Sequence, residues 1–403
     1  MEKVVVTGLG AVCSIGNNVD EYWNALINSK SGIRRIQDIS TDEHDTKVGA
    51  EVDDGFEEIV KKHWKKRQLN STTKSARFGL CASVEAVEDS GINFDECDRT
   101  RVAVIYGVSE SGMKDKELDN KKNYILKDML STVPAMISMR YNIHGASFSI
   151  ATACATSANA IVIAKQMIES GVYDVVIVGG LSSKIAHDKL SGFNQLLALS
   201  VNPDPETACR PFTKGRDGFI MGEGAGTLVL ESETSAKKRN ARIYCQLSGG
   251  AMYSEAFNMT APETDGTGMA NCMHMALENA GISPEKVDYI NVHGTSTGLN
   301  DKYETMAIKE VFGKNAKNIP VSSTKSAIGH TLGACGALEA VVCVKALENG
   351  IIPPTLHYDE PDPELDLDYV PNKAREKELN VVVSNSFAFG GRNATLVFNK
   401  YNG

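Results

Sequence analysis

The chain has 403 residues, which exceeds the roughly 250–300 residues at which single hydrophobic cores stop growing, so we expect two domains or two fused halves. Hydrophobic residues make up 42% and charged residues 23% of the chain, which excludes disordered, collagen-like and coiled-coil chains. The 51 acidic residues outnumber the 42 lysines and arginines, giving a formal charge of -9. A net-acidic chain makes a poor general binder of nucleic acid, so we expect no nucleic-acid partner.

The cysteines and the hydropathy pattern indicate the cellular compartment in which the protein works. The nine cysteines are odd in number and form no CxxC pair, which argues against zinc ribbons, thioredoxin-type sites and disulfide scaffolds. The opening MEKVVVTGLG reads as a strand, with no basic segment followed by an apolar one. Since no run of about 18 apolar residues occurs, we expect no membrane span and predict a cytoplasmic protein.

Alternating strand and helix patterns predict the fold class. Short β-branched runs that end near glycine suit strands buried on both faces, and they occur at 4–10, 102–107, 175–180, 289–294 and 381–391. Helical periodicity covers 19–32 and 76–91, and the second segment stops at a glycine, as helices commonly do. The alternation predicts α/β layers.

A weak internal duplication divides the chain. In 171–183 and again in 281–297, a glycine after a helix pattern leads into a strand and then into a loop of glycine, serine and threonine. We place the boundary between the halves near 240–250. The prediction is an N-terminal half at 1–245 and a C-terminal half at 246–403.

The glycine-rich start VVVTGLGAVCSIG only partly matches a dinucleotide-binding fingerprint. Cys13 occupies the position of the third glycine, and no acidic residue ends a strand about 20 residues later. Nucleotide binding is therefore disfavoured. We expect no bound cofactor and no metal ligand set.

The strongest local signal surrounds Cys154, in SFSIATACATSANAIVIAKQMIESG (147–171). A β-rich run leads into the cysteine, and a helix pattern of small residues follows. Unpaired amide groups and the helix dipole at such a helix start stabilise an anion. We therefore expect the pKa of this thiol to be lowered, which favours the nucleophilic thiolate. The alternative is a buried structural cysteine, the role we assign to the other eight.

Two histidines lie in comparable loops of the C-terminal half. His293 ends a strand pattern in NVHGTSTGLND, and His330 lies in SSTKSAIGHTLGACGALEA. A single loop histidine is usually a solvated side chain, but two beside glycines, together with a nucleophile-like cysteine, favour a catalytic site. Lys325 and Glu339 lie close enough in sequence to orient a histidine; the alternative is an ordinary surface pair.

Read together, TACATSAN, VHGTSTGLND, STKSAIGHTLGACGALEA and NSFAFGGRN resemble the motif set of the β-ketoacyl-acyl-carrier-protein synthases. The most similar branch is the elongating synthase II group, with the ketosynthases of type II polyketide systems. The resemblance runs from about residue 3 to 399. It implies a thiolase-like fold, with duplicated βαβαβαββ halves in five αβαβα layers, and a dimer.

The resemblance implies roles for the singled-out residues. Cys154 would take an acyl chain from acyl carrier protein as a thioester. His293 and His330 would serve decarboxylation of a malonyl thioester, with the division of labour between them left open. Lys325 and Glu339 would support the histidines. Condensation of the two substrates would elongate a fatty acyl, polyketide or polyene chain.

Further residues correspond to the gate, the arm-binding groups and the docking surface of the family. The backbone amides of Cys154 and Phe389 would form the oxyanion hole, and the Phe389 side chain would gate the site. Thr295 and Thr297 would bond the phosphopantetheine arm of the carrier; a simple Ser/Thr turn is the alternative. The basic residues Lys65, Lys66 and Arg67, in KKHWKKRQ, would dock the acidic carrier protein, or else belong to a solvated helix face.

Several alternatives remain open at this stage. The segment 108–138 lacks the usual family pattern, which leaves the acyl length and the partner undecided and favours a specialised ketosynthase over a housekeeping fatty-acid elongase. A non-catalytic chain-length-determining subunit is a second hypothesis, although Cys154 argues against it. A degradative thiolase is disfavoured because a second catalytic cysteine is absent from the C-terminal motif. The dimer is either a homodimer or a heterodimer with a ketosynthase-like chain-length factor.

Overall fold

The structure is a computed structural model that describes residues 2–110 and 123–403. Residues 111–122, which belong to the segment 108–138, lie outside the described residues. Within the described residues, no helix is both long enough and apolar enough to cross a membrane.

The first and last strands of the N-terminal half are long and lie beside each other. Its strands are β1 (Val4–Cys13), β2 (Arg34–Arg35), β3 (Val48–Gly49), β4 (Val102–Val108), β5 (Ser147–Ile150), β6 (Val175–Leu181) and β7 (Gly224–Ser232). Its α-helices are α1 (Val19–Ile27), α2 (Phe56–His63), α3 (Lys66–Leu69), α4 (Lys74–Ser90), α5 (Tyr124–Asp128), α6 (Thr132–Tyr141), α7 (Thr156–Glu169), α8 (His187–Gln195) and α9 (Glu233–Lys238). Short 3-10 turns include η1 (Phe94–Glu96), η2 (Arg99–Arg101) and η4 (Ala153–Ala155).

The second half repeats the pattern with shorter parallel strands. Its strands are β8 (Cys245–Ser254), β9 (Tyr289–Asn291), β10 (Val321–Ser322), β11 (Ile351–Ile352), β12 (Arg375–Glu376), β13 (Val381–Ala388) and β14 (Arg392–Lys400). Its α-helices are α10 (Thr267–Ala280), α11 (Gly298–Phe312), α12 (Lys325–Ile328) and α13 (Cys335–Asn349). The 3-10 turns are η5 (Pro284–Lys286), η6 (Gly313–Asn318) and η7 (Leu332–Ala334).

The strand order shows the duplication directly. Within the described residues the main sheet runs β10-β9-β13-β14-β8-β1-β7-β6-β4-β5. In each half, two outer parallel neighbours are followed by two antiparallel pairings: β4 with β6, β6 with β7 and β7 with β1, matched by β9 with β13, β13 with β14 and β14 with β8. The five-strand order of one half is thus the order of the other.

The two halves meet where β1 pairs with β8, at Val5 with Gln246 and Val6 with Cys245. This short antiparallel contact joins the two five-stranded sheets along one edge. We propose that the chain divides at the start of β8, into halves 1–245 and 246–403.

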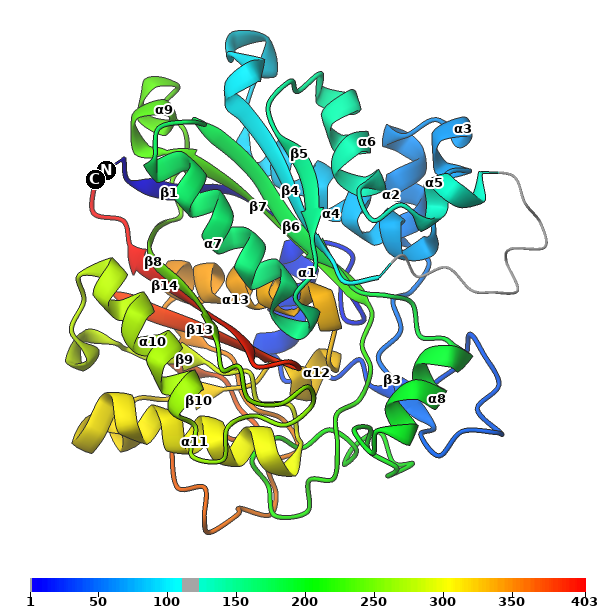
Figure 1. Cartoon of the computed structure of the whole chain (residues 1–403), viewed down its shortest axis with the longest axis vertical. Helices are drawn as coiled ribbons and strands as arrows, with labels where there is room; N and C mark the ends of the chain where they lie inside the picture. Colours follow the sequence, from blue (N-terminus) through cyan, green and yellow to red (C-terminus); the bar gives the residue numbers. More distant parts are fainter. Residues whose placement is uncertain (1, 111–122) are drawn as a thin grey trace.

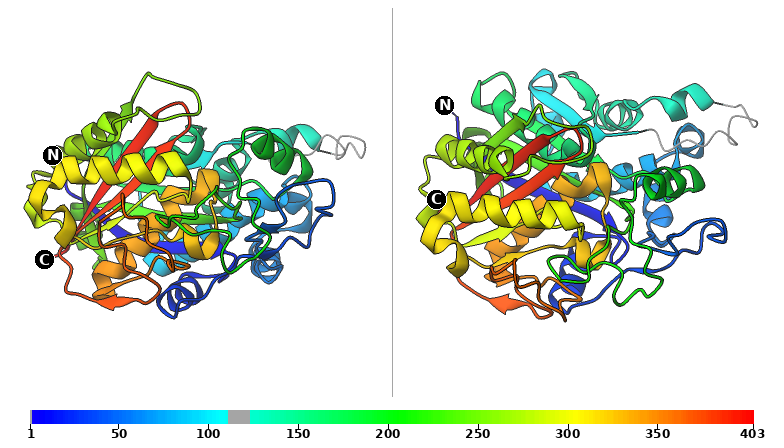
Figure 2. Two further views of the ribbon diagram at one scale, coloured as in Figure 1. Left: turned by 90° about the horizontal axis from the view of Figure 1, so that it is seen from below. Right: turned by 60° about the horizontal axis from the view of Figure 1, so that its bottom comes forward.

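Helices complete the predicted five layers. Helix α4 packs on β1 and β7, helices α7 and α13 pack against each other and against both sheets, and helices α10 and α11 cover the C-terminal side (Figure 1). Two further views place α11 and the β2–α3 region at opposite ends of the molecule (Figure 2). The predicted fold class is confirmed by this arrangement.

Local sequence explains how tightly the layers pack. A Cβ atom on Gly10 would lie 1.9 Å from the carbonyl oxygen of Ala82 in α4, so only glycine lets this helix lie on β1. Gly10 therefore serves the packing of α4 on β1. Helix α4 ends at Gly91, whose φ of 60° is left-handed, which confirms the predicted glycine end.

Candidate active site

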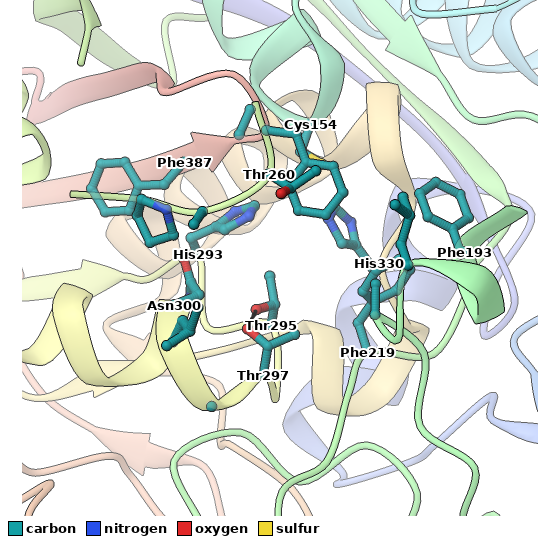
Figure 3. Close-up of a pocket in the computed structure, with 18 of the residues that line it drawn as sticks. Cys154, Phe193, Phe219, Thr260, His293, Thr295, Thr297, Asn300, His330 and Phe387 are labelled. Atoms are coloured by element: carbon teal, nitrogen blue, oxygen red, sulfur yellow. Dashed lines mark hydrogen bonds between the residues drawn. The ribbon is translucent and has the colours of Figure 1, made fainter. Parts of the chain in front are cut away.

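A cavity of about 350 Å³ brings together side chains of both halves (Figure 3). Its apolar wall includes Phe193, Phe219, Leu332 and Phe387. Its polar lining includes Cys154 from the first half and His293, Thr295, Thr297 and His330 from the second.

Cys154 lies in η4, between the edge strand β5 and the first turn of α7. The preceding Ala153 has a φ of 50°, a left-handed conformation that costs energy for a residue other than glycine. This strained turn holds the thiol at the start of α7, where the sequence places it. The backbone N–H groups of Phe389 and of Cys154 itself interact with the sulfur and favour its anionic form.

The expectation of a lowered thiol pKa is wrong for this structure. Burial is the largest influence and raises the pKa of Cys154 to about 11, although Lys325 and the two backbone amides act in the opposite direction. The apolar walls exclude water from the sulfur, and this destabilises the thiolate more than the helix start stabilises it. The resting group is therefore a thiol, which must lose its proton when it reacts.

His293 is held through its backbone by a buried acid. Its N–H donates to Glu304 Oε1 at 2.8 Å, and the N–H of Gly294 donates to Oε2 at 2.8 Å. Burial, then the charge of Lys325 and the neighbouring His330, lower the pKa of His293 well below its usual value. The imidazole is therefore neutral at neutral pH.

His330 has a defined tautomer. The backbone N–H of Leu332 donates to its Nδ1 at 3.2 Å, so Nδ1 is an acceptor and the ring proton of the neutral imidazole lies on Nε2. Burial and the charge of Lys325 lower the pKa of His330 well below its usual value. Among the described residues no protein group bonds Nε2, which leaves an N–H donor for a substrate.

The thiol and the two imidazoles converge. One ligand-type atom from each of Cys154, His293 and His330 lies within 4.8 Å of the others, and the two rings meet edge to face with centroids 5.4 Å apart. One sulfur and two imidazole nitrogens also resemble a zinc donor set. A ligating nitrogen needs a free lone pair, however, and His330 offers a protonated Nε2 to the cavity, so its tautomer favours hydrogen bonding over metal ligation.

Comparison with known families identifies the class of this site. The family model for the N-terminal domain of beta-ketoacyl synthases matches residues 1–236, and the model for the C-terminal domain matches residues 244–359. The chain belongs to the β-ketoacyl synthase family. The resemblance inferred from the four sequence motifs is thereby confirmed, and ketosynthases of this family are acyltransferases.

Individual relatives and structures agree with this assignment. The chain is 41% identical to the 3-oxoacyl-[acyl-carrier-protein] synthase 2 of Coxiella burnetii, with 99% of each chain covered. The ishigamide ketosynthase/chain length factor is similar at 33% identity and a TM-score of 0.90, with both chains fully covered. A type II polyketide ketosynthase bound to its acyl-carrier protein is similar at 31% identity and a TM-score of 0.89, covering 99% of this chain and 100% of that one. These neighbours carry the thiolase-like fold of ketosynthases.

The predicted supporting pair of this ketosynthase is a buried ion pair. Lys325 Nζ donates to Glu339 Oε1, and both side chains are nearly inaccessible. Burial is the largest single influence and lowers the pKa of the lysine, but Glu339, Cys335 and Glu304 together outweigh it and the pKa is raised. Burial is the main reason that both imidazoles are neutral, and the positive charge of Lys325 acts in the same direction.

The predicted gate and arm-binding residues lie at the cavity. Phe389 lines it and occupies the turn between β13 and β14, where Gly390 and Gly391 have φ values of 79° and 63°. The hydroxyls of Thr295 and Thr297 hydrogen-bond to each other at 2.9 Å and face the same cavity. These positions are compatible with the implied roles, which remain proposals.

The predicted docking residues are not part of the cavity. Lys65, Lys66 and Arg67 are exposed around α3, on the side of the molecule that carries α5 and α6 (Figure 1). Within the described part of the chain, no carboxylate pairs with any of the three. They are free to meet an external partner.

Two buried acids of α11 were not predicted from the sequence. Glu304 fixes the loop of His293, and Asp301 accepts from the N–H of Phe212 at 2.9 Å and lies 3.8 Å from the Arg216 guanidinium. Their spacing of three residues in GLNDKYE places both on one helix face. The sequence did carry a signal, because both acids lie on the face of α11 that otherwise carries apolar residues.

The raised pKa of Cys154 predicts the pH dependence of its alkylation. A thiol with a pKa of about 11 is protonated at neutral pH, so its reaction with iodoacetamide should accelerate about tenfold per pH unit from pH 7 to 10. Intact-protein mass spectrometry measures the rate, and the Cys154→Ala protein subtracts reaction at other cysteines. A rate that levels off near neutral pH would mean that the helix start dominates after all.

Proposed function

We propose that this ketosynthase condenses a malonyl unit held on acyl carrier protein with an acyl chain held as a thioester on Cys154. The observation that carries the proposal is the convergence of one thiol and two neutral imidazoles within 4.8 Å in a mostly apolar cavity. The product is a 3-oxoacyl chain two carbons longer than the acyl substrate. The protein acts in fatty acid or polyketide synthesis.

The first half-reaction transfers the acyl group. The Cys154 sulfur attacks the acyl thioester, a new carbon–sulfur bond forms, and the carrier thiol leaves with the proton that the cysteine loses. The N–H groups of Cys154 and Phe389, which interact with the sulfur, are suitably placed to stabilise the oxyanion of the tetrahedral intermediate. The high thiol pKa makes this proton release part of the barrier.

The second half-reaction forms the carbon–carbon bond. Loss of CO2 from the malonyl thioester leaves an enolate, whose oxygen carries the developing negative charge. Neutral imidazole N–H groups stabilise this charge by hydrogen bonding, and His330 Nε2–H is free for that role. The enolate carbon then attacks the Cys154 thioester and expels the thiolate, which takes a proton from water.

The carrier supplies both substrates on its phosphopantetheine arm. We infer that Thr295 and Thr297 hydrogen-bond this arm and that Phe389 gates the cavity, because all three line it. The chain itself needs no resident cofactor for these steps.

The direct test follows both half-reactions with purified protein. Incubation with acyl carrier should add the acyl mass to the protein, and subsequent malonyl carrier should release CO2 and yield the 3-oxoacyl carrier. Failure to acquire an acyl mass would favour the non-catalytic chain-length-determining subunit. Acylation from coenzyme A thioesters with no use of malonyl carrier would favour a degradative thiolase.

The exposed edge of the sheet supports a dimer. Strand β5 ends the ten-stranded sheet with one paired neighbour, β4, and unpaired strand edges invite pairing with another chain. Nearby helices α5 and α6 and the turn between them expose large apolar side chains, namely Tyr124, Ile125, Leu126, Met129 and Met139. We infer that this face pairs either with a second copy or with a ketosynthase-like chain-length factor, as one similar structure pairs with such a factor.

The free cysteines support a reducing location. All nine cysteines lie within the described residues and none is disulfide-bonded, as the sequence predicts. Cytoplasm is the compartment that we propose, since disulfides are rare there.

Charge reversal of the docking residues should weaken carrier use. Changing Lys65, Lys66 and Arg67 to glutamate should raise KM for the acidic carrier about tenfold and flatten its salt dependence, because complementary charge speeds encounter. The rate with a small pantetheine thioester should not change. Steady-state kinetics at two salt concentrations measures both effects.

A matched control reverses exposed lysines elsewhere. Lys286 and Lys314 are exposed near the ends of α10 and α11, and Lys373 is exposed before β12. Changing these three lysines to glutamate should leave KM for the carrier unaltered. If both sets of substitutions raised KM for the carrier equally, net charge alone would explain the effect, and the docking role would be wrong.

A further inference from the structure

Cys335 contacts His330 but has no part in the steps above. It is the first residue of α13 and is buried. Its Sγ lies 3.0 Å from His330 Nδ1, on the side of the ring that faces away from the substrate nitrogen. A thiol this close to a reacting imidazole influences where the ring proton lies.

The direction of this hydrogen bond follows from a neighbouring one. The backbone N–H of Leu332 already donates to Nδ1, so that nitrogen carries a lone pair and no proton. The proton between sulfur and nitrogen therefore belongs to Cys335, whose S–H donates. Burial raises the pKa of Cys335 to about 12, so the thiol retains this proton throughout the neutral range.

A third group extends the chain of donors. Thr331 Oγ1 lies 3.4 Å from the Cys335 sulfur and donates its hydroxyl proton to it. The sequence of donors is thus Thr331 O–H to sulfur, sulfur S–H to Nδ1, and Nε2–H to the cavity. Successive hydrogen bonds of one direction polarise each other.

We propose that Cys335 is a positioning residue for His330, whose thiol acts with the N–H of Leu332 to hold the Nε2–H tautomer and strengthens that N–H as a donor in the decarboxylation step. The proposal rests on the proposed function, because it assumes that Nε2–H meets the enolate oxygen. In the opposite tautomer the Cys335 S–H would have to turn away from the ring, and the buried N–H of Leu332 would lose its acceptor. Electron withdrawal by two donors at Nδ1 also makes the opposite N–H more acidic.

The test compares two substitutions at Cys335 with a control on the same helix. Cys335→Ala should lower kcat for malonyl-carrier decarboxylation about three- to tenfold, the scale of one net hydrogen bond, with KM unchanged. Cys335→Ser, which keeps a donor, should restore a rate close to that of the wild-type protein. Cys343→Ala, a buried cysteine two turns along α13, should leave decarboxylation unaltered.

Acylation of Cys154 separates positioning from packing. Transfer of the acyl group does not use the Nε2–H of His330, so Cys335→Ala should acylate at the wild-type rate. Equal loss in both half-reactions would overturn the proposal in favour of a packing role, as would a normal decarboxylation rate in Cys335→Ala. Thr331→Val should cause a smaller loss, and no further loss when combined with Cys335→Ala, because both act through one chain.

A spectroscopic measurement keeps this inference separate from the proposed function. Nitrogen NMR of protein labelled at histidine reports which ring nitrogen of His330 carries the proton, without any substrate. The wild-type and Cys335→Ser proteins should show the Nε2–H form alone, and Cys335→Ala should admit some of the other tautomer. A wild-type protein that does not decarboxylate would refute the proposed function, whereas an Nδ1–H ring in the wild-type protein would refute the role of Cys335.

Discussion

Cys154→Ala should abolish condensation and should leave no acyl-enzyme. Removal of the nucleophile takes away the atom that forms the thioester, and losses of at least about 10⁴-fold are expected when a covalent nucleophile is removed. Mass spectrometry after incubation with acyl carrier should detect no added mass. Product formation should fall to background.

The same variant should still decarboxylate malonyl carrier. The positions of His293 and His330 do not depend on the sulfur. Decarboxylation should therefore run at a rate close to that of the wild-type protein. Cys97→Ala is the matched control. Cys97 is only partly buried, like Cys154, but unlike Cys154 it does not line the cavity. Normal condensation by Cys154→Ala, or loss of activity in Cys97→Ala, would contradict the assignment of the nucleophile.

The fold could be predicted well from local patterns. Fully buried strands such as β1, β4 and β6 are continuous apolar runs in the sequence, and Gly91 ends α4 where the glycine signal predicts. The contact of β1 with β8 could not be predicted in the same way, because it joins the two halves through backbone groups that carry no residue-specific signal. The boundary near residue 245 therefore stays a proposal.

The positions of the site residues could also be predicted, but their electrostatics could not. Cys154, His293 and His330 each lie in a contiguous motif, and the fold brings the three together. The thiol pKa depends instead on burial in a cavity that residues of both halves line. A helix start is visible in the sequence, whereas the loss of water around it is a property of the packed cavity.

The supporting groups show the same limit. The resemblance implies that Lys325 and Glu339 support the histidines, and the two side chains form a buried ion pair. Glu304 acts on the backbone of His293 and Cys335 on the far side of the His330 ring, contacts that no motif distinguishes from ordinary packing. The docking role of the basic residues on α3 stays a prediction, since it concerns a partner.

His330→Ala should lose decarboxylation of malonyl carrier. The Nε2–H donor that faces the cavity disappears, and removal of one such donor to a developing oxyanion typically costs about 10²–10³-fold in rate. The release of CO2 from malonyl carrier measures the effect directly. Acylation of Cys154 should continue, because the sulfur and the amides of Cys154 and Phe389 remain in place.

The split between the two half-reactions is what identifies the role of His330. A histidine that merely packs would disturb both, since its ring contacts Phe219 and His293 at centroid distances of 5.0 and 5.4 Å. His274→Ala, on the exposed face of α10, should change neither half-reaction and controls for the loss of an imidazole. If His330→Ala decarboxylates at the wild-type rate, the enolate must be stabilised by His293 alone, and the tautomer fixed at His330 would have no catalytic purpose.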